Sequence, residues 1–202
     1  MKSSKLSSMV VHSLLAATLC TIGNVSIADT QQVASVSPEE MTKLVASCSA
    51  CHGADGISPS AEWPNLAGQK AGYMATQIKA VRDGSREVPT MSVFVQDLDD
   101  AQIEALSEHY ASLPAAGGPT MASASLPGAN IRGKCISCHG VEGKTVNQEW
   151  PNLAGQKKEY LEAQLLAFRS GSRVGPPMNN IARMFDEQEI KDVAEYYSQT
   201  GK

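Results

Sequence analysis

Two short stretches, Cys48-Ser49-Ala50-Cys51-His52 and Cys135-Ile136-Ser137-Cys138-His139, lie 87 residues apart in this chain of 202 residues. The same offset places the octapeptide 63–70 on the identical octapeptide 150–157. An ungapped match of this length indicates a duplicated domain. Further pairs that follow in the same register are Tyr73 and Tyr160, Gln77 and Gln164, Arg82 and Arg169, Arg86 and Arg173, Met91 and Met178, and Tyr110 and Tyr197.

The stretch between the two copies is rich in Pro, Gly, Ala and Ser and shows no helical pattern, which is typical of a linker. We therefore expect a first domain over residues 29–113, a linker over 114–128 and a second domain over 129–202.

Residues 1–28 have the pattern of a secretory signal peptide. Lys2 and Lys5 precede an apolar run, and Ser26-Ile27-Ala28 is a small-residue cleavage site. A membrane-spanning anchor is the alternative, but the apolar run is short for a span and contains polar residues. The sequence thus predicts a secreted protein, with residues 1–28 removed.

Both copies have the pattern of helices. Ser37-Pro38 predicts a helix start with Glu40 completing a capping box, and middle helices are expected to stop at Gly84 and Gly171. Last helices are expected to open at Asp99 and Asp186. Neither copy offers an alternating run typical of a strand, so the predicted fold class is all-α.

Composition limits the function. The net charge is -4, and removal of the signal peptide takes away only basic residues, so a nucleic-acid partner is excluded. Aromatic residues make up only 5% of the chain, which suggests that a group other than side chains fills the interior. The odd fifth cysteine, Cys20, lies in the signal peptide, so the four remaining cysteines fall into the two repeated motifs.

Cys-x-x-Cys-His is the attachment signature of c-type haem, in which two thiols form thioethers with the porphyrin and the histidine ligates the iron. Three alternatives compete with this reading. A thioredoxin-like redox pair requires a βαβ context that is absent, and a zinc site requires four ligands in one domain. Disulfides would leave His52 and His139 unexplained. The sequence therefore predicts two covalently bound haem c groups.

The repeat also suggests further haem contacts. Met91 and Met178 each follow the motif histidine by 39 residues, in segments read as Pro-containing loops, and a methionine thioether is a standard axial ligand. Pro64 and Pro151 each follow that histidine by 12 residues, and a proline carbonyl is a suitable acceptor for the other ring N–H.

Four arginines that recur in register permit two interpretations. They could neutralise haem propionates, or they could be solvated cations at helix ends, where the helix dipole favours them. The sequence leaves both open for Arg82, Arg86, Arg169 and Arg173.

Taken together, these motifs look like class I cytochrome c, and the tandem pair with Trp-Pro-Asn-Leu-Ala-Gly-Gln and a following Tyr resembles the dihaem cytochrome c4 family. The resemblance implies two cytochrome c domains related by a pseudo-twofold axis. It also implies His/Met ligation by His52 with Met91 and by His139 with Met178, and acceptor roles for Pro64 and Pro151. Periplasmic electron transfer toward terminal oxidases is implied as well, with loose membrane association left open.

Two six-coordinate haems would leave no open position for a small substrate, which favours an electron carrier over an enzyme. The expected partners are redox proteins: a quinol-oxidising membrane complex or another donor, and a terminal oxidase as acceptor. The competing hypothesis is the cytochrome subunit of a larger enzyme such as a flavocytochrome c sulfide dehydrogenase. A peroxidase with one labile methionine is a third, and the oligomeric state stays open.

Overall fold

The computed structural model describes residues 36–117 and 126–200, and these residues form helices and connecting segments without a strand. The described residues make one compact unit. The predicted signal peptide and the middle of the predicted linker lie outside the described residues. The all-α prediction is confirmed for the part that is described.

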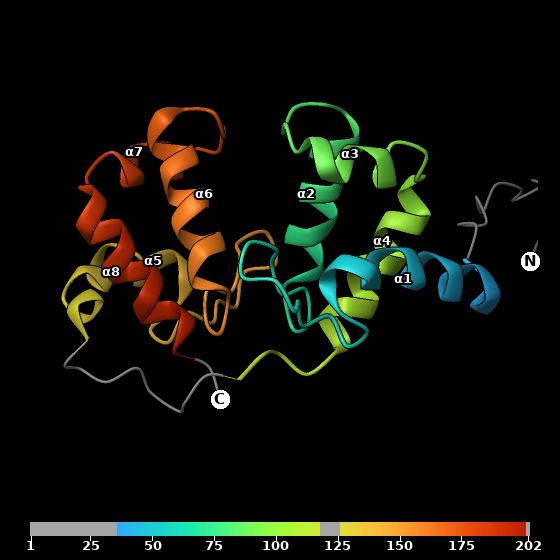
Figure 1. Ribbon diagram of the computed structural model, residues 1–202, viewed down its shortest axis with the longest axis horizontal. Coiled ribbons are helices and arrows are strands. Elements are labelled where there is room, and N and C mark those ends of the chain that lie inside the picture. The colour runs from blue at the N-terminus through green and yellow to red at the C-terminus, as the bar shows by residue number, and fades with distance from the viewer. Residues whose placement is uncertain (1–35, 118–125, 201–202) are drawn as a thin grey trace, which may run out of the picture. The chain divides into compact units, whose positions relative to one another are not determined.

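Each copy of the repeat forms its own set of helices, shown in Figure 1. The first half contains α1 (Pro38–His52), α2 (Ala71–Arg82), α3 (Pro89–Val95) and α4 (Asp100–Ser112). The second half contains η1 (Pro127–Ala129), η2 (Ile131–Lys134), α5 (Ile136–His139), α6 (Lys158–Ser170), α7 (Met178–Ala182) and α8 (Glu187–Ser198).

The helix starts follow the capping residues. Asp99 and Asp186 each cap their helix in a complete capping box, as predicted. Ser37 also caps α1 by accepting from the Glu40 N–H at 3.2 Å. The box expected there is wrong, however, because the Glu40 carboxylate instead accepts a hydrogen bond from Gln102 of α4 at 2.6 Å. Glu40 thus ties α1 to α4.

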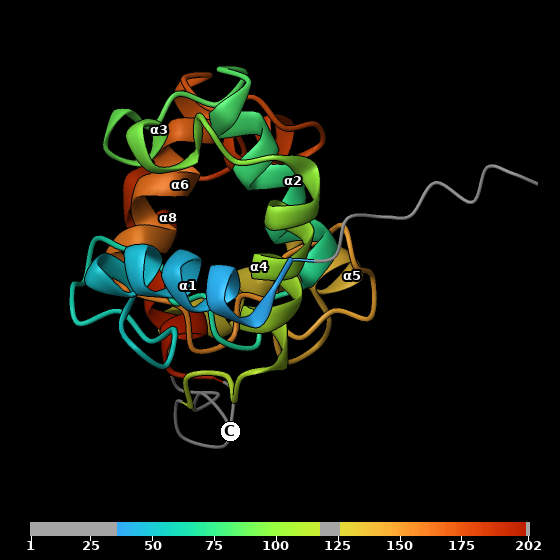
Figure 2. The same ribbon diagram turned by 90° about the vertical axis from the view of Figure 1, so that its right-hand side faces the viewer.

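Corresponding helices pack in the same way in both halves. In the first half α2 packs against α4 and α1 meets α4, which can be followed in Figures 1 and 2. In the second half α6 packs against α8. Both cores reach the first cysteine of their motif: Met74, Leu106 and Tyr110 pack near Cys48, and the corresponding cluster around Tyr197 packs near Cys135.

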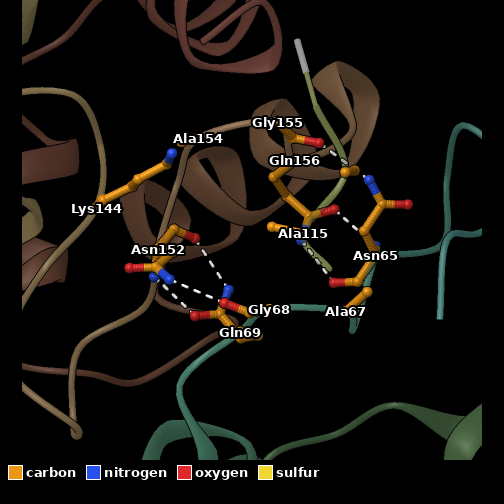
Figure 3. Close-up of a pocket in the computed structure, with 11 residues that line it drawn as sticks. Asn65, Ala67, Gly68, Gln69, Ala115, Lys144, Asn152, Ala154, Gly155 and Gln156 are labelled. Atoms are coloured by element: carbon orange, nitrogen blue, oxygen red, sulfur yellow. Dashed lines mark hydrogen bonds between the residues drawn. The ribbon is translucent and has the colours of Figure 1, made fainter. Parts of the chain in front are cut away.

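Two reciprocal pairs of hydrogen bonds join the halves, as Figure 3 shows. The Asn65 N–H donates to Gln156 Oε1 at 2.8 Å, and Gln156 Nε2 donates back to the Asn65 carbonyl at 2.9 Å. The twin pair joins the Asn152 N–H to Gln69 Oε1 at 2.7 Å and Gln69 Nε2 to the Asn152 carbonyl at 2.9 Å. Exchange of the same contacts in both directions is what a twofold relation requires, in agreement with the predicted pseudo-twofold axis.

Candidate haem-binding sites

The two motif histidines end their helices and turn the chain in the same way. His52 is the last residue of α1 and His139 the last of α5, and each is followed by a glycine with positive φ. A Cβ on Gly53 would lie 2.1 Å from the Ile57 carbonyl oxygen, and one on Gly140 would lie 2.1 Å from that of Lys144. Only glycine permits this turn, which carries the chain toward the proline beside each histidine.

Each histidine is buried, with 6% of its surface exposed, and contacts the proline twelve residues later. His52 Nδ1 lies 2.9 Å from the Pro64 carbonyl oxygen, and His139 Nδ1 lies 2.9 Å from that of Pro151. Since a carbonyl only accepts, Nδ1 carries the proton and Nε2 has a free lone pair. Burial lowers the pKa of both histidines, against the opposing effect of the proline contact, and this favours the neutral ring that a metal ligand needs.

The four cysteines are free, half-buried thiols. Burial raises the pKa of Cys48 and raises that of Cys135 to about 11. The described part of the chain has no strand, so the βαβ context of a thioredoxin-like redox pair is absent there. Within residues 36–117 and 126–200, no cluster of three His, Cys, Asp or Glu side chains is placed to hold a metal ion.

Met91 and Met178 lie in short helices, so the loops expected around them are wrong. Met91 is in α3, which begins at Pro89, and Met178 is the first residue of α7, directly after Pro177. The prolines start these helices because their fixed φ and missing N–H suit a first helical turn. α3 packs on α2 and α7 packs on α6. Both methionines are half-buried.

Tyr110 and Tyr197 are a matched pair in the repeat, and each lies beside a candidate site. They pack with Cys48 and Cys135, respectively. Their buried hydroxyls have no hydrogen-bond partner in the described part of the chain, and burial raises the pKa of both phenols. A buried polar atom without a partner is unusual in a folded protein, and in both halves it occurs next to the cysteine that would hold a haem. The repeated aromatic position was the signal in the sequence that could have found them.

The four repeated arginines divide into two kinds. Arg82 pairs with Asp83 and Asp100 at 2.8 and 2.7 Å, and Arg169 pairs with Glu187 at 3.1 Å. Arg86 and Arg173 instead contact neutral side chains of both halves. The reading as solvated helix ends is therefore wrong for Arg173, which is only 8% exposed.

Comparisons with known proteins agree with this geometry. The family model described as "Cytochrome c" matches residues 126–200, and that described as "Cytochrome C oxidase, cbb3-type, subunit III" matches residues 36–109. A cytochrome c4 from Pseudomonas aeruginosa is 30% identical to the chain, over 92% of this chain and 98% of the relative. The chain belongs to the cytochrome c4 family.

Two further matches extend the result. The crystal structure of reduced cytochrome c4 from Pseudomonas stutzeri superposes with a TM-score of 0.74 at 28% identity, covering 82% of this chain and 99% of that one. A "Thiosulfate dehydrogenase electron acceptor" from Stutzerimonas stutzeri is 36% identical over 77% of this chain and 79% of the relative. The tandem class I cytochrome c fold is thereby confirmed, and electron transfer is the function that members of this family share.

Cytochrome c domains bind haem c covalently, and the residues present fit that group. Each half offers two thiols three positions apart, a neutral imidazole with a free Nε2 and a methionine thioether from a separate helix. This donor set matches the His/Met ligation of c-type haem.

Proposed function

We propose that each half of the chain holds one covalently bound haem c and that the protein carries electrons one at a time through the two irons. The observation that carries the proposal is the pair of histidine–proline contacts, both 2.9 Å long. The proposed thioether and axial residues are Cys48, Cys51, His52 and Met91 in the first half, and Cys135, Cys138, His139 and Met178 in the second.

The chain's own residues would prepare each iron site. When bound, the haem iron supplies a one-electron couple between its ferric and ferrous forms. The carbonyls of Pro64 and Pro151 fix the tautomer and orientation of the two imidazoles. A methionine thioether raises the reduction potential relative to a second histidine. If His52 with Met91 and His139 with Met178 hold the two irons, each site would be suited to electron transfer and closed to small substrates.

The domain boundaries remain those predicted from the repeat: 29–113, a linker over 114–128, and 129–202. The signal peptide predicted over residues 1–28 supports a periplasmic location. None of the helices in the described part of the chain has the length and apolar character needed to cross a bilayer. We place the carrier in the periplasm, exchanging electrons with protein partners, and a terminal oxidase is the acceptor that the family resemblance implies.

Carbon monoxide binding to the fully reduced protein tests the proposal, after a redox titration in the visible spectrum has counted two haems. We expect no binding by the wild-type protein, because a histidine and a methionine would leave no iron position open. Met91→Ala and Met178→Ala should each bind one carbon monoxide per chain. Met184→Ala is the control, since Met184 is 58% exposed and lies outside the proposed ligand set. Tight binding by the wild-type protein would contradict the assignment.

A second candidate function has specific support. Two relatives named "Thiosulfate dehydrogenase electron acceptor" are 36% and 35% identical to the chain. The structure of a thiosulfate dehydrogenase from Marichromatium purpuratum superposes with a TM-score of 0.66 at 33% identity, covering 76% of this chain and 36% of that larger one. The chain would then accept electrons from a thiosulfate-oxidising enzyme. The flavocytochrome subunit hypothesis stays a prediction.

The identity of the electron donor separates the two roles. The oxidised protein is mixed with a thiosulfate dehydrogenase and thiosulfate, and haem reduction is followed by visible absorbance. Fast reduction that requires all three components favours the acceptor role. Reduction only by a quinol-oxidising complex, followed by reoxidation by a terminal oxidase, favours the respiratory carrier. Co-purification of a flavoprotein with the native protein would favour the flavocytochrome subunit.

A further inference from the structure

Asn179 directly follows Met178 and ties its segment to α6. Its Oδ1 accepts a hydrogen bond from the Gly175 N–H, and its Nδ2 donates to the carbonyls of Phe168 and Arg173, all three at 2.8 Å. Phe168 lies in the last turn of α6, where carbonyls have no donor within the helix. These partners fix the orientation of the amide, because the opposite orientation would point its oxygen at two carbonyls. One side chain thus joins α6, the connection after it and the start of α7.

The connection between α6 and α7 is also packed closely against α6. A Cβ added to Gly175 would lie 2.9 Å from Cε1 of Phe168. α7 itself packs on the same helix, as can be followed in Figure 1. The hydrogen bonds of Asn179 are partly buried, and such bonds are stronger than bonds exposed to water. Met178 is therefore the first residue of a helix whose start is fixed to its neighbour.

The corresponding residue in the first half is Ser92, directly after Met91. Its hydroxyl donates to the Val88 carbonyl at 3.1 Å, one turn earlier in the same segment. Among the described residues, the Ser92 side chain makes no hydrogen bond to α2. Arg82 at the end of α2 does donate to the Leu98 carbonyl at 3.1 Å, but that carbonyl lies seven residues after Met91. The first methionine segment is thus held by its own short helix, whereas the second is also tied to the helix on which it packs.

We propose that Asn179 is a positioning residue that holds Met178 on its iron, and that Met91 is therefore the axial methionine that an added ligand displaces more readily. The proposal rests on the proposed function. A methionine can leave the iron only if its thioether moves away, together with the backbone that carries it. Movement of the Met178 backbone strains the three hydrogen bonds of Asn179. Movement of the Met91 backbone strains no such tie to the neighbouring helix.

Displacement of methionine by imidazole tests the proposal in the oxidised, haem-loaded protein. The oxidised form is used because a soft thioether binds ferric iron more weakly than ferrous iron. Methionine-ligated ferric haem gives a weak red absorption band, which disappears when imidazole replaces the methionine. In the wild-type protein we expect the band to disappear in two phases of equal amplitude. Met91→Ala should lack the fast phase, and Met178→Ala should lack the slow phase.

Asn179→Ser introduces the residue that the first half has at this position. It should accelerate the slow phase by at least about tenfold, as expected when two or more ordinary hydrogen bonds are lost. The fast phase should stay unchanged, which also shows that the fold is retained. Asn180→Ser is the matched control, because Asn180 is the exposed neighbour in the same helix, and it should change neither phase. Amide hydrogen exchange gives a second readout: the Gly175 N–H should lose protection in Asn179→Ser and keep it in Asn180→Ser.

Four results would overturn the positioning role. A single phase in the wild-type protein would show that both methionines are held equally, and loss of the slow phase in Met91→Ala would reverse the assignment. An unchanged slow phase in Asn179→Ser would leave its hydrogen bonds with a purely structural role. Equal acceleration of both phases would indicate general loosening of the protein. The proposed function fails in a different way: fewer than two haems, or no red band in the oxidised wild-type protein, would contradict His/Met ligation itself.

Discussion

The segments that lead into the two Cys-x-x-Cys-His motifs differ in structure between the two halves. In the first half the motif ends one continuous helix, α1, of 15 residues. In the second half the corresponding stretch is broken into η1, η2 and the four-residue α5. Yet the histidine–proline distance is 2.9 Å in both. The geometry of the motif is therefore set by the turn that follows it and does not depend on the helix before it.

Particular residues explain the broken helix. Pro127 lacks a backbone N–H, and Gly128 and Gly133 cost about 1 kcal/mol each in a helix relative to alanine. Gly128 also packs against α8, where a Cβ would lie 2.2 Å from the Asp192 carbonyl oxygen. The second half thus exchanges helical hydrogen bonds for a close backbone contact with its last helix.

The largest effect is expected from removing the two cysteines that are proposed to hold the haem in one half. Cys48→Ser with Cys51→Ser, and Cys135→Ser with Cys138→Ser, should each reduce the covalent haem content from two to one per chain, measured by mass spectrometry. The unfolding midpoint should fall further for the second pair, because its motif rests on a single helical turn and depends more on the haem for order. Equal midpoints in the two double variants would show that the preceding helix adds nothing to the stability of the site.

Much of the fold and the site could be predicted from the sequence because the signals are local. Asp99 and Asp186 gave the starts of the last helices, since capping depends on residues within one turn. The spacing from His52 to Pro64 predicted a contact whose distance is 2.9 Å. Assignment of these residues to haem remains a prediction that the experiments above address.

What the sequence could not predict depends on contacts between distant residues. Glu40 does not complete the expected capping box because its carboxylate accepts a hydrogen bond from Gln102, 62 residues away. The segments around Met91 and Met178 are helical and not loops. A proline can either rigidify a loop or start a helix, and the outcome depends on residues that are near it in space. The division of four matched arginines into two kinds required knowing which of them face the other half.

A smaller effect is expected from the contact that replaces the helix in the second half. Gly128→Ala should destabilise the protein by about 1–3 kcal/mol, because its Cβ would also lie 2.7 Å from the Tyr196 Cβ and α8 would have to shift. Gly133→Ala is the matched control: nothing lies within 4 Å of its Cβ, and the change should stabilise by about 0.4–1 kcal/mol. Denaturant unfolding of the haem-loaded variants measures both. An unchanged free energy of unfolding in Gly128→Ala would mean that α8 can shift away from the added Cβ without loss of stability.

The smallest expected effect concerns the two capping boxes, which differ by one residue. The first half uses Gln102 and the second uses Glu189 to accept from the N-cap N–H, at 3.0 and 2.9 Å. Only Gln102 has a second task, because its Nε2 donates to Glu40. Gln102→Glu would set two carboxylates against each other and lose that hydrogen bond, at a cost of about 1 kcal/mol at pH 7.

The converse change, Glu189→Gln, keeps the acceptor of the box and has no such partner to lose, so it should shift stability by no more than about 0.5 kcal/mol. The repulsion introduced by Gln102→Glu acts between two charges, so its cost should shrink as the salt concentration rises. Denaturant midpoints at low and at high salt measure this difference. A cost that is the same at both salt concentrations would mean that the lost hydrogen bond to Glu40, and not the charge, links α1 to α4.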